Sequence, residues 1–93
     1  MKTEQSSIAV YSKQGCPFCS LLKMELGKRG FDYSEFDLSD DATRQSFYAE
    51  TGVNTVPQVF IHAEKASLTQ PFGVRIGGWS EVSSDWEALE KAR

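Results

Sequence analysis

Cysteine and histidine are both scarce in this sequence, and their scarcity limits the kinds of site it can build. The 93 residues include two cysteines, Cys16 and Cys19, and one histidine, His62. A structural zinc site needs four ligands, so the cysteine pair could supply only half of one. In a reducing cytosol we also do not expect two cysteines to form a structural disulfide. We therefore expect no resident metal.

Long apolar runs, an apolar leader and an excess of basic residues are missing as well. The longest apolar runs are a few residues, whereas a membrane-spanning helix needs about 20. Residues 1–7 are polar and lack the apolar region of a secretory signal. The net charge is −3, whereas a nucleic-acid-binding domain presents a basic face. We expect a cytoplasmic protein that binds neither membrane nor nucleic acid.

The composition is that of an ordinary globular protein, with 40% hydrophobic and 25% charged residues. The length suits one domain, which we expect to span residues 1–93. Short runs rich in β-branched and aromatic residues predict strands at Ile8–Ser12, Tyr33–Leu38, Gln58–His62 and Phe72–Ile76. Caps and apolar spacing predict helices over Pro17–Arg29 and from Ser39–Asp41 to about Thr51. They also predict a last helix, capped by Ser80, that carries Val82, Trp86 and Leu89. The polar stretch Ala63–Pro71 is expected to be a loop.

This order of elements, β-α-β-α-β-β-α, predicts an α/β fold. The first two strands belong to a βαβ unit, whose right-handed crossover requires them to be parallel. The third and fourth strands are expected to pair as an antiparallel hairpin. The result would be a mixed four-stranded sheet flanked by helices.

The spacing of Cys16 and Cys19 is the most informative feature of the chain. Cys16 follows a strand and a turn at Gly15, and it precedes Pro17, a residue favoured in the first helical turn. A thiolate there accepts hydrogen bonds from unpaired backbone N–H groups, and such positions lower the pKa of a cysteine from its usual value of about 8.5. Lys13 adds positive charge nearby. We expect Cys16, exposed, to attack disulfides and Cys19, shielded one turn later, to resolve the mixed disulfide.

Three other interpretations of the pair stay open at this point: half of a zinc site, a structural disulfide, and two inert buried cysteines. A disulfide across so short a loop constrains the unfolded chain little. The sequence Gly-Cys-Pro-aromatic-Cys at a strand–helix junction also argues against two cysteines that merely fill a core. Redox chemistry explains the spacing best.

Three motifs, taken together, resemble the glutaredoxin family. They are Tyr11-Ser12-Lys13-Gln14-Gly15-Cys16-Pro17-Phe18-Cys19, Thr55-Val56-Pro57 and Ile76-Gly77-Gly78-Trp79-Ser80. The resemblance extends from about Ile8 to Leu89. It implies a thioredoxin fold, a cis peptide bond before Pro57, and a glutathione-dependent thiol–disulfide oxidoreductase of the dithiol, Cys-Pro-Phe-Cys type.

The resemblance also implies where glutathione binds. Lys13 would bind its glycine carboxylate, with Phe18 packed beside it. The backbone of Val56 would pair with the extended thiol substrate as a one-residue strand addition. The residues after the double glycine would hold the γ-glutamyl end at a helix N-terminus, where backbone N–H groups favour a carboxylate. The implied glutathione contacts are Lys13, Phe18, Thr55, Val56, Pro57, Gly78, Trp79, Ser80 and Glu81.

The sequence departs from the family pattern in two places. Trp-Ser-Glu follows the double glycine where many members have Cys-Asp or Tyr-Thr-Asp, although a hydroxyl and an acid are retained. The loop Ala63–Val74 is longer than the hairpin usual in the family, and we expect it to be a tolerated surface extension. The lone His62 is expected at the rim of a strand rather than in a site.

The function implied by the resemblance is reduction of protein disulfides and of glutathione mixed disulfides by a monomer, with glutathione as the reductant and ribonucleotide reductase as one candidate partner. Two other functions stay open. A redoxin fed by thioredoxin reductase is disfavoured by the implied glutathione contacts. An iron–sulfur scaffold is disfavoured because cluster-binding members usually carry Cys-Gly-Phe-Ser, whereas this chain has Pro17 and Cys19.

Overall fold

The structure, a computed structural model, describes residues 8–61 and 74–91. Two strand–helix units come first: β1 (Ile8–Ser12), α1 (Pro17–Lys28), β2 (Ser34–Asp37) and α2 (Asp41–Thr51). They are followed by β3 (Gln58–Ile61), β4 (Val74–Gly77), α3 (Trp79–Ser84) and α4 (Trp86–Glu90). The predicted order is confirmed except that the last helix is divided in two.

The described strands form a mixed four-stranded sheet in the order β2-β1-β3-β4. β1 runs parallel to β2 and antiparallel to β3, with Val10 opposite Val59. β3 and β4 pair antiparallel, as the hairpin prediction requires. Because β1 lies between two other strands and both its faces are covered, all five of its residues are buried.

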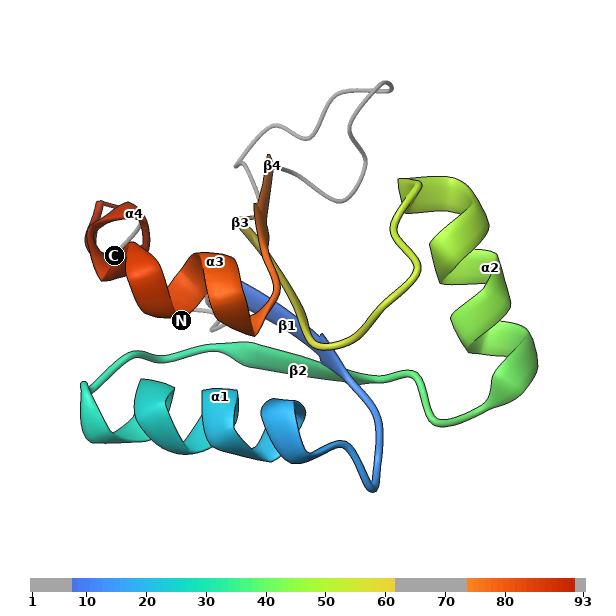
Figure 1. Cartoon of the computed structure of the whole chain (residues 1–93), viewed down its shortest axis with the longest axis horizontal. Helices are drawn as coiled ribbons and strands as arrows, with labels where there is room; N and C mark the ends of the chain where they lie inside the picture. Colours follow the sequence, from blue (N-terminus) through green and yellow to red (C-terminus); the bar gives the residue numbers. More distant parts are fainter. Residues whose placement is uncertain (1–7, 62–73, 92–93) are drawn as a thin grey trace, which may run out of the picture.

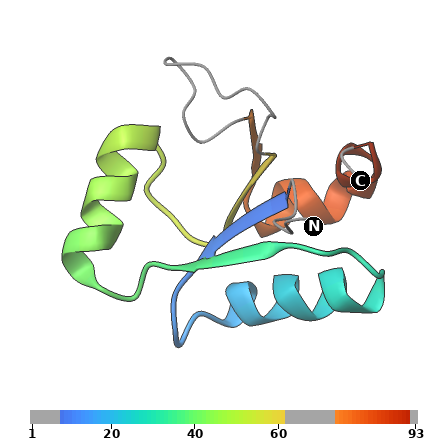
Figure 2. The same cartoon turned by 180° about the vertical axis from the view of Figure 1, so that it is seen from behind.

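Helices cover the two faces of the sheet separately, and the cores follow the alternation of side chains along β1. Val10 faces the helices α1, α3 and α4, through Leu22, Val82 and Leu89. Tyr11 faces the other way and stacks on Phe47 of α2, with ring centroids 4.4 Å apart. Figures 1 and 2 show α1 with α3 and α4 on one side of the molecule and α2 on the other.

Most predicted boundaries are confirmed within one or two residues. α1 ends at Lys28 rather than Arg29, and α2 begins after Asp40, whose carboxylate accepts from the Thr43 N–H at 2.9 Å. β2 is one residue shorter at each end than predicted, and β3 begins at Gln58 as predicted. His62, the loop Ala63–Pro71 and the first two residues of the predicted fourth strand lie outside the described residues, and β4 extends one residue further, to Gly77.

The prediction of one last helix capped by Ser80 is wrong. The helix already begins at Trp79, so Ser80 lies inside its first turn, and Asp85 interrupts it with φ −150° and ψ 67°. The apolar spacing is nonetheless correct, because Val82 and Leu89 are both fully buried in the same core. The break leaves Trp86 half-buried, where the guanidinium of Arg29 lies 4.0 Å from the centre of its ring.

Candidate active site

Cys16 and Cys19 lie at the start of α1 and are joined by a disulfide bond. Their Cα atoms are 5.2 Å apart, within the usual range for bridged cysteines. A helix that begins at Pro17 makes this possible because its first turn returns Cys19 toward Cys16. The described molecule is therefore the oxidised form of a dithiol pair.

Cys16 is more exposed than Cys19, as predicted, but the difference between them is smaller than predicted. Cys16 is 9% exposed and Cys19 is 1% exposed. The expectation that Cys16 is openly exposed is therefore wrong for the oxidised form. Its covering includes the turn before Pro57, where the Val56 carbonyl oxygen lies 3.8 Å from Cys16 Sγ. Cys16 remains the more exposed of the two residues, which suits it to react with an incoming disulfide.

The N-terminus of α1 presents a hydrogen-bond donor to Cys16. Cys16 is the N-cap residue, and the Cys19 N–H donates to its Sγ at 3.2 Å. No acidic residue stands in the first turn of this helix. Since the N-terminal end of a helix carries partial positive charge, a negative charge that forms on Cys16 is stabilised there.

The turn before β3 supplies the second side of the site. The Val56-Pro57 peptide bond is cis, as the resemblance implied. Among residues 8–61 and 74–91, the Val56 carbonyl has only Cys16 Sγ as a polar neighbour. That backbone is thus available for the strand-like pairing expected of an extended thiol substrate.

A pocket of about 270 Å³ opens beside this turn. We call it the cis-proline pocket; it is lined by Phe18, Thr55, Val56, Pro57, Gly78, Trp79, Ser80 and Glu81. Every glutathione contact implied by the sequence lines it, except Lys13. Three segments far apart in the chain therefore meet here. None of these residues lines the larger cavity of about 560 Å³ between β2 and α2, around Phe36.

The double glycine allows the walls of the cis-proline pocket to approach each other. A Cβ on Gly78 would lie 3.0 Å from the Pro57 carbonyl oxygen, and a Cβ on Gly77 would lie 2.6 Å from the Cβ of Glu81. Gly77 also has φ 133°, a conformation that side chains rarely adopt. A side chain at either position would push the start of α3 away from its neighbours.

The start of α3 is occupied by a carboxylate of the protein itself. Glu81 accepts a hydrogen bond from the Gly78 N–H at 2.9 Å. Hydrogen bonds from its own backbone N–H and from that of Gly78 lower the pKa of Glu81, and the charge of Arg75 contributes in the same direction. The N–H groups expected to receive a γ-glutamyl carboxylate are thus partly engaged already.

Lys13 lies in a different pocket from the other predicted contacts. This second pocket, of about 370 Å³, is lined by Ser12, Lys13, Gln14, Lys23, Glu35 and Asp37. Within it Glu35 accepts from Lys23 at 2.7 Å and from the Ser12 hydroxyl at 2.8 Å, which ties α1 and β1 to β2. The hydrogen bond from Lys23 is the main reason that the pKa of Glu35 is lowered.

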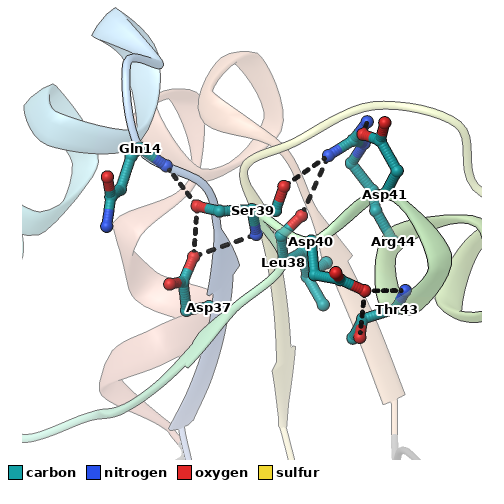
Figure 3. Close-up of polar contacts among 8 residues, drawn as sticks. All are labelled: Gln14, Asp37, Leu38, Ser39, Asp40, Asp41, Thr43 and Arg44. Carbon is teal, nitrogen blue, oxygen red and sulfur yellow. Dashed lines mark hydrogen bonds and ion pairs between the residues drawn. The ribbon is translucent and has the colours of Figure 1, made fainter.

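Sequence reasoning missed the residues that hold the turn before Cys16. The Gln14 N–H donates to the Ser39 hydroxyl at 2.9 Å, and that hydroxyl donates to Asp37 at 2.5 Å, as Figure 3 shows. Arg44 donates to the carbonyl oxygens of Leu38 and Ser39 from α2. From the sequence, the run Ser39-Asp40-Asp41 could be interpreted only as a helix cap. Nothing local in the sequence indicates that Ser39 hydrogen-bonds with Gln14.

It also missed a pair behind the cis-proline pocket, Gln58 and Arg75. Gln58 is 1% exposed and hydrogen-bonds with Thr55 on one side and with Arg75 on the other. The one available signal was a glutamine at the start of a predicted strand that is otherwise apolar, since an amide that becomes buried there needs partners.

Comparison with known proteins identifies the family. The glutaredoxin family profile matches residues 8–65. The chain belongs to the glutaredoxin family. Glutaredoxin 3 of Escherichia coli is 32% identical over 60 residues, which are 63% of this chain and 72% of that protein. A hybrid peroxiredoxin of Haemophilus influenzae is 47% identical over 57 residues, 61% of this chain but only 24% of that protein.

Solved structures agree with the fold. Glutaredoxin 1 from Francisella tularensis, complexed with cacodylate, has a TM-score of 0.72 at 25% identity, over 90% of this chain and 95% of that one. A buckwheat glutaredoxin–glutathione complex has a TM-score of 0.68 at 28% identity, over 90% and 71% of the two chains. The thioredoxin fold is thereby confirmed, and family and fold support a thiol–disulfide oxidoreductase.

Two features are absent from residues 8–61 and 74–91. No helix there is long and apolar enough to cross a membrane. Nor do the described residues bring together three or more histidine, cysteine or acidic side chains that could hold a metal ion.

Proposed function

We propose that this glutaredoxin is a dithiol, glutathione-dependent oxidoreductase that reduces glutathione mixed disulfides and protein disulfides, with Cys16 as the nucleophile and Cys19 as the resolving thiol. The observation that carries the proposal is the cis-proline pocket. Phe18 of its lining belongs to the Cys-Pro-Phe-Cys motif, and Val56 contacts Cys16 Sγ. The reacting sulfur and the pocket are therefore adjacent.

The first step uses the helix terminus. The Cys16 thiolate attacks the glutathione sulfur of a mixed disulfide, and a Cys16–glutathione disulfide forms as the partner leaves as a thiolate and takes up a proton. The Cys19 N–H, 3.2 Å from Sγ in the oxidised form, stabilises the thiolate before the attack. A second glutathione thiolate then attacks the glutathione sulfur of that disulfide, which releases oxidised glutathione and restores the Cys16 thiolate.

Protein disulfides require the second cysteine. After Cys16 has formed a mixed disulfide with the protein, the Cys19 thiolate attacks Cys16 Sγ and releases the protein thiol, which leaves the Cys16–Cys19 disulfide seen in the structure. Two molecules of glutathione return it to the dithiol and become oxidised glutathione. Burial of Cys19 favours this division of roles, because an external disulfide reaches Cys16 first.

Glutathione is an extended tripeptide with two carboxylates, and the cis-proline pocket suits one end of it. The Val56 backbone would pair with its cysteinyl residue, and Trp79, Ser80 and Glu81 would surround its γ-glutamyl end. The buckwheat complex supports glutathione as the ligand, because that protein shares the fold of this chain. Lys13 is proposed to bind the glycine carboxylate from outside the pocket, as a mobile charge on a flexible stem.

Two protein partners are proposed, one from a relative and one from the family resemblance. A hybrid peroxiredoxin contains a segment 47% identical to part of this chain, so an oxidised peroxiredoxin is the first protein substrate to test. Ribonucleotide reductase is the second. We propose that the protein works in the cytoplasm as a monomer, where glutathione keeps thiols reduced.

The test is turnover of a glutathionylated peptide with glutathione, NADPH and glutathione reductase. We expect saturable turnover by the wild-type protein, loss of it in Cys16→Ser, and retention in Cys19→Ser. Thioredoxin reductase replaces the glutathione system in a parallel assay. Reduction of the Cys16–Cys19 disulfide by thioredoxin reductase, with none by glutathione, would contradict the proposal and favour a thioredoxin-type redoxin.

A further inference from the structure

Gln58 makes an unusual set of contacts directly behind the cis-proline pocket. It is the first residue of β3, follows Pro57, and is 1% exposed. Its Oε1 accepts from Arg75 Nε at 2.9 Å. Its Nε2 donates to the Thr55 carbonyl oxygen at 3.2 Å and to Thr55 Oγ1 at 3.1 Å. The side chain thus reaches back across Pro57 and holds Thr55 by two atoms.

Arg75 decides the direction of these hydrogen bonds. A guanidinium can only donate, so the amide must present its oxygen to Arg75 and its NH₂ group to Thr55. Thr55 Oγ1 is therefore the acceptor in its contact with Gln58. A hydroxyl that accepts through a lone pair still has its own hydrogen to donate. Among the described residues no other group takes that hydrogen, and Thr55 is exposed and lines the pocket.

We propose that Arg75 and Gln58 act as positioning residues that orient the Thr55 hydroxyl to donate a hydrogen bond to a carboxylate of glutathione in the cis-proline pocket. This inference rests on the proposed function and deepens it. It gives Thr55 the role of a hydrogen-bond donor toward an acceptor group of the ligand. Neither Gln58 nor Arg75 lines the pocket, so both act through Thr55.

The position of Arg75 supports the choice of a carboxylate. Arg75 lies on β4 and donates to Gln58, which in turn holds Thr55. Hydrogen bonds from backbone N–H groups are the main cause of the lowered pKa of Glu81, and the charge of Arg75 makes a smaller contribution in the same direction. The Glu81 carboxylate stands on the α3 wall, so the positive charge of Arg75 favours an anionic ligand group on the Thr55 side of the pocket.

The test is a double-mutant cycle on the glutathione KM, with Gln58→Leu, Thr55→Val and the combination. Each single variant should raise the KM roughly tenfold, the loss expected of one hydrogen bond to a charged group, with little change in kcat. If Gln58 acts through Thr55, Gln58→Leu should have no further effect in the Thr55→Val protein. Reduction of the Cys16–Cys19 disulfide by dithiothreitol, which has no carboxylate, should be unchanged throughout.

Further variants separate orientation from folding. Arg75→Leu frees the amide to turn over and should raise the KM several-fold, whereas Arg75→Lys keeps a donor and should restore most of the affinity. Thr55→Ser keeps the hydroxyl and should behave like the wild type. Thr51→Val is the matched control, since it removes a hydroxyl that donates to Phe47 O in α2. Should Gln58→Leu fail to fold, Arg75→Leu combined with Thr55→Val completes the same cycle.

The outcomes are distinguishable. Additive KM effects in the cycle, or equal loss of dithiothreitol reduction, would overturn the positioning role and leave the proposed function intact. Wild-type protein that shows no saturable dependence on glutathione would overturn the proposed function, and this inference with it.

Discussion

The N-termini of α1 and α3 both adjoin the candidate site, but their unpaired N–H groups are used differently. At α1 the Cys19 N–H donates to the sulfur of Cys16, and the first turn holds no acidic residue. At α3 the carboxylate of Glu81 accepts from the Gly78 N–H. The positive potential at the N-terminus of α1 is thus available to a negative charge that forms on Cys16. The potential at the N-terminus of α3 is neutralised by Glu81.

The comparison teaches that the local charge of the first turn, and not the helix alone, decides which terminus can serve chemistry. A carboxylate in the first turn of α1 would compete with the Cys16 thiolate for the same potential. A neutral residue in place of Glu81 would remove the negative charge from the start of α3. Four predictions test this difference, beginning with the largest expected effect.

Loss of the sulfur at the first terminus should abolish activity. We expect Cys16→Ser to lower turnover of a glutathionylated peptide by at least about a thousandfold, because a serine hydroxyl at neutral pH is a far weaker nucleophile than a thiolate. Cys19→Ser should keep this activity and lose only the reduction of protein disulfides. The coupled glutathione reductase assay measures both, and substantial residual turnover in Cys16→Ser would exclude Cys16 as the nucleophile.

Crowding the second terminus should destabilise the fold. Gly77→Ala places a Cβ 2.6 Å from the Cβ of Glu81 at a positive φ. We expect a loss of about 2 kcal/mol in the free energy of unfolding, the scale of such backbone strain, measured by urea denaturation. Gly27→Ala is the control, because a Cβ there meets nothing within 4 Å, and it should be neutral or stabilising. Equal stability of Gly77→Ala and the wild type would contradict the close packing of α3 against β4.

Adding a carboxylate to the first turn of α1 should make that terminus resemble α3. Phe18 is 55% exposed, so Phe18→Glu can be compared with its neutral match, Phe18→Gln. A nearby negative charge disfavours the Cys16 thiolate, so alkylation of reduced Cys16 by iodoacetamide at neutral pH should be roughly three- to tenfold slower in Phe18→Glu. About 1 M salt should shrink the difference. Equal rates in the two variants at low salt would mean that the terminus does not control the thiolate.

Neutralising Glu81 should have the smallest effect, and it should depend on pH. The folded pKa of Glu81 is lowered, so its stabilising contribution is present above its ordinary value of 4.5 and is lost as the pH falls through the lower folded value. Glu81→Gln should therefore melt a few degrees below the wild type at pH 7, and the two melting curves should converge toward pH 3. Glu87→Gln in α4 is the control, and a pH-independent difference for Glu81→Gln would refute the charge-based explanation.

The fold was largely predictable because its signals are local. The apolar spacing of Leu22 and Leu26 and the β-branched composition of β1 and β3 define elements whose order permits few topologies. The failure at the last helix also has a local origin, because a continuous apolar spacing conceals a break. Trp86 keeps its place in the pattern although Asp85 leaves the helical conformation.

The site was predictable where motifs mark it and hidden where contacts cross the sheet. The cysteines, the Thr55-Val56-Pro57 turn and the double glycine each carry a recognisable pattern. Gln58 and Arg75 belong to no such pattern, because their partnership depends on the offset between β3 and β4. Lys13 belongs to a recognisable motif, but the structure places it in a pocket separate from the other predicted glutathione contacts.

The sequence by itself determined the dithiol, its unequal cysteines and the strand–helix order, because each depends on residues within one helical turn or one strand of each other. Only the tertiary structure decided that Phe18, Val56 and Glu81 share one pocket, that Cys16 is mostly covered in the oxidised form, and that Glu81 neutralises the start of α3. The physical reason is distance along the chain. The walls of the pocket come from α1, the turn before β3 and the start of α3, and only the packing of the sheet and its helices places them together.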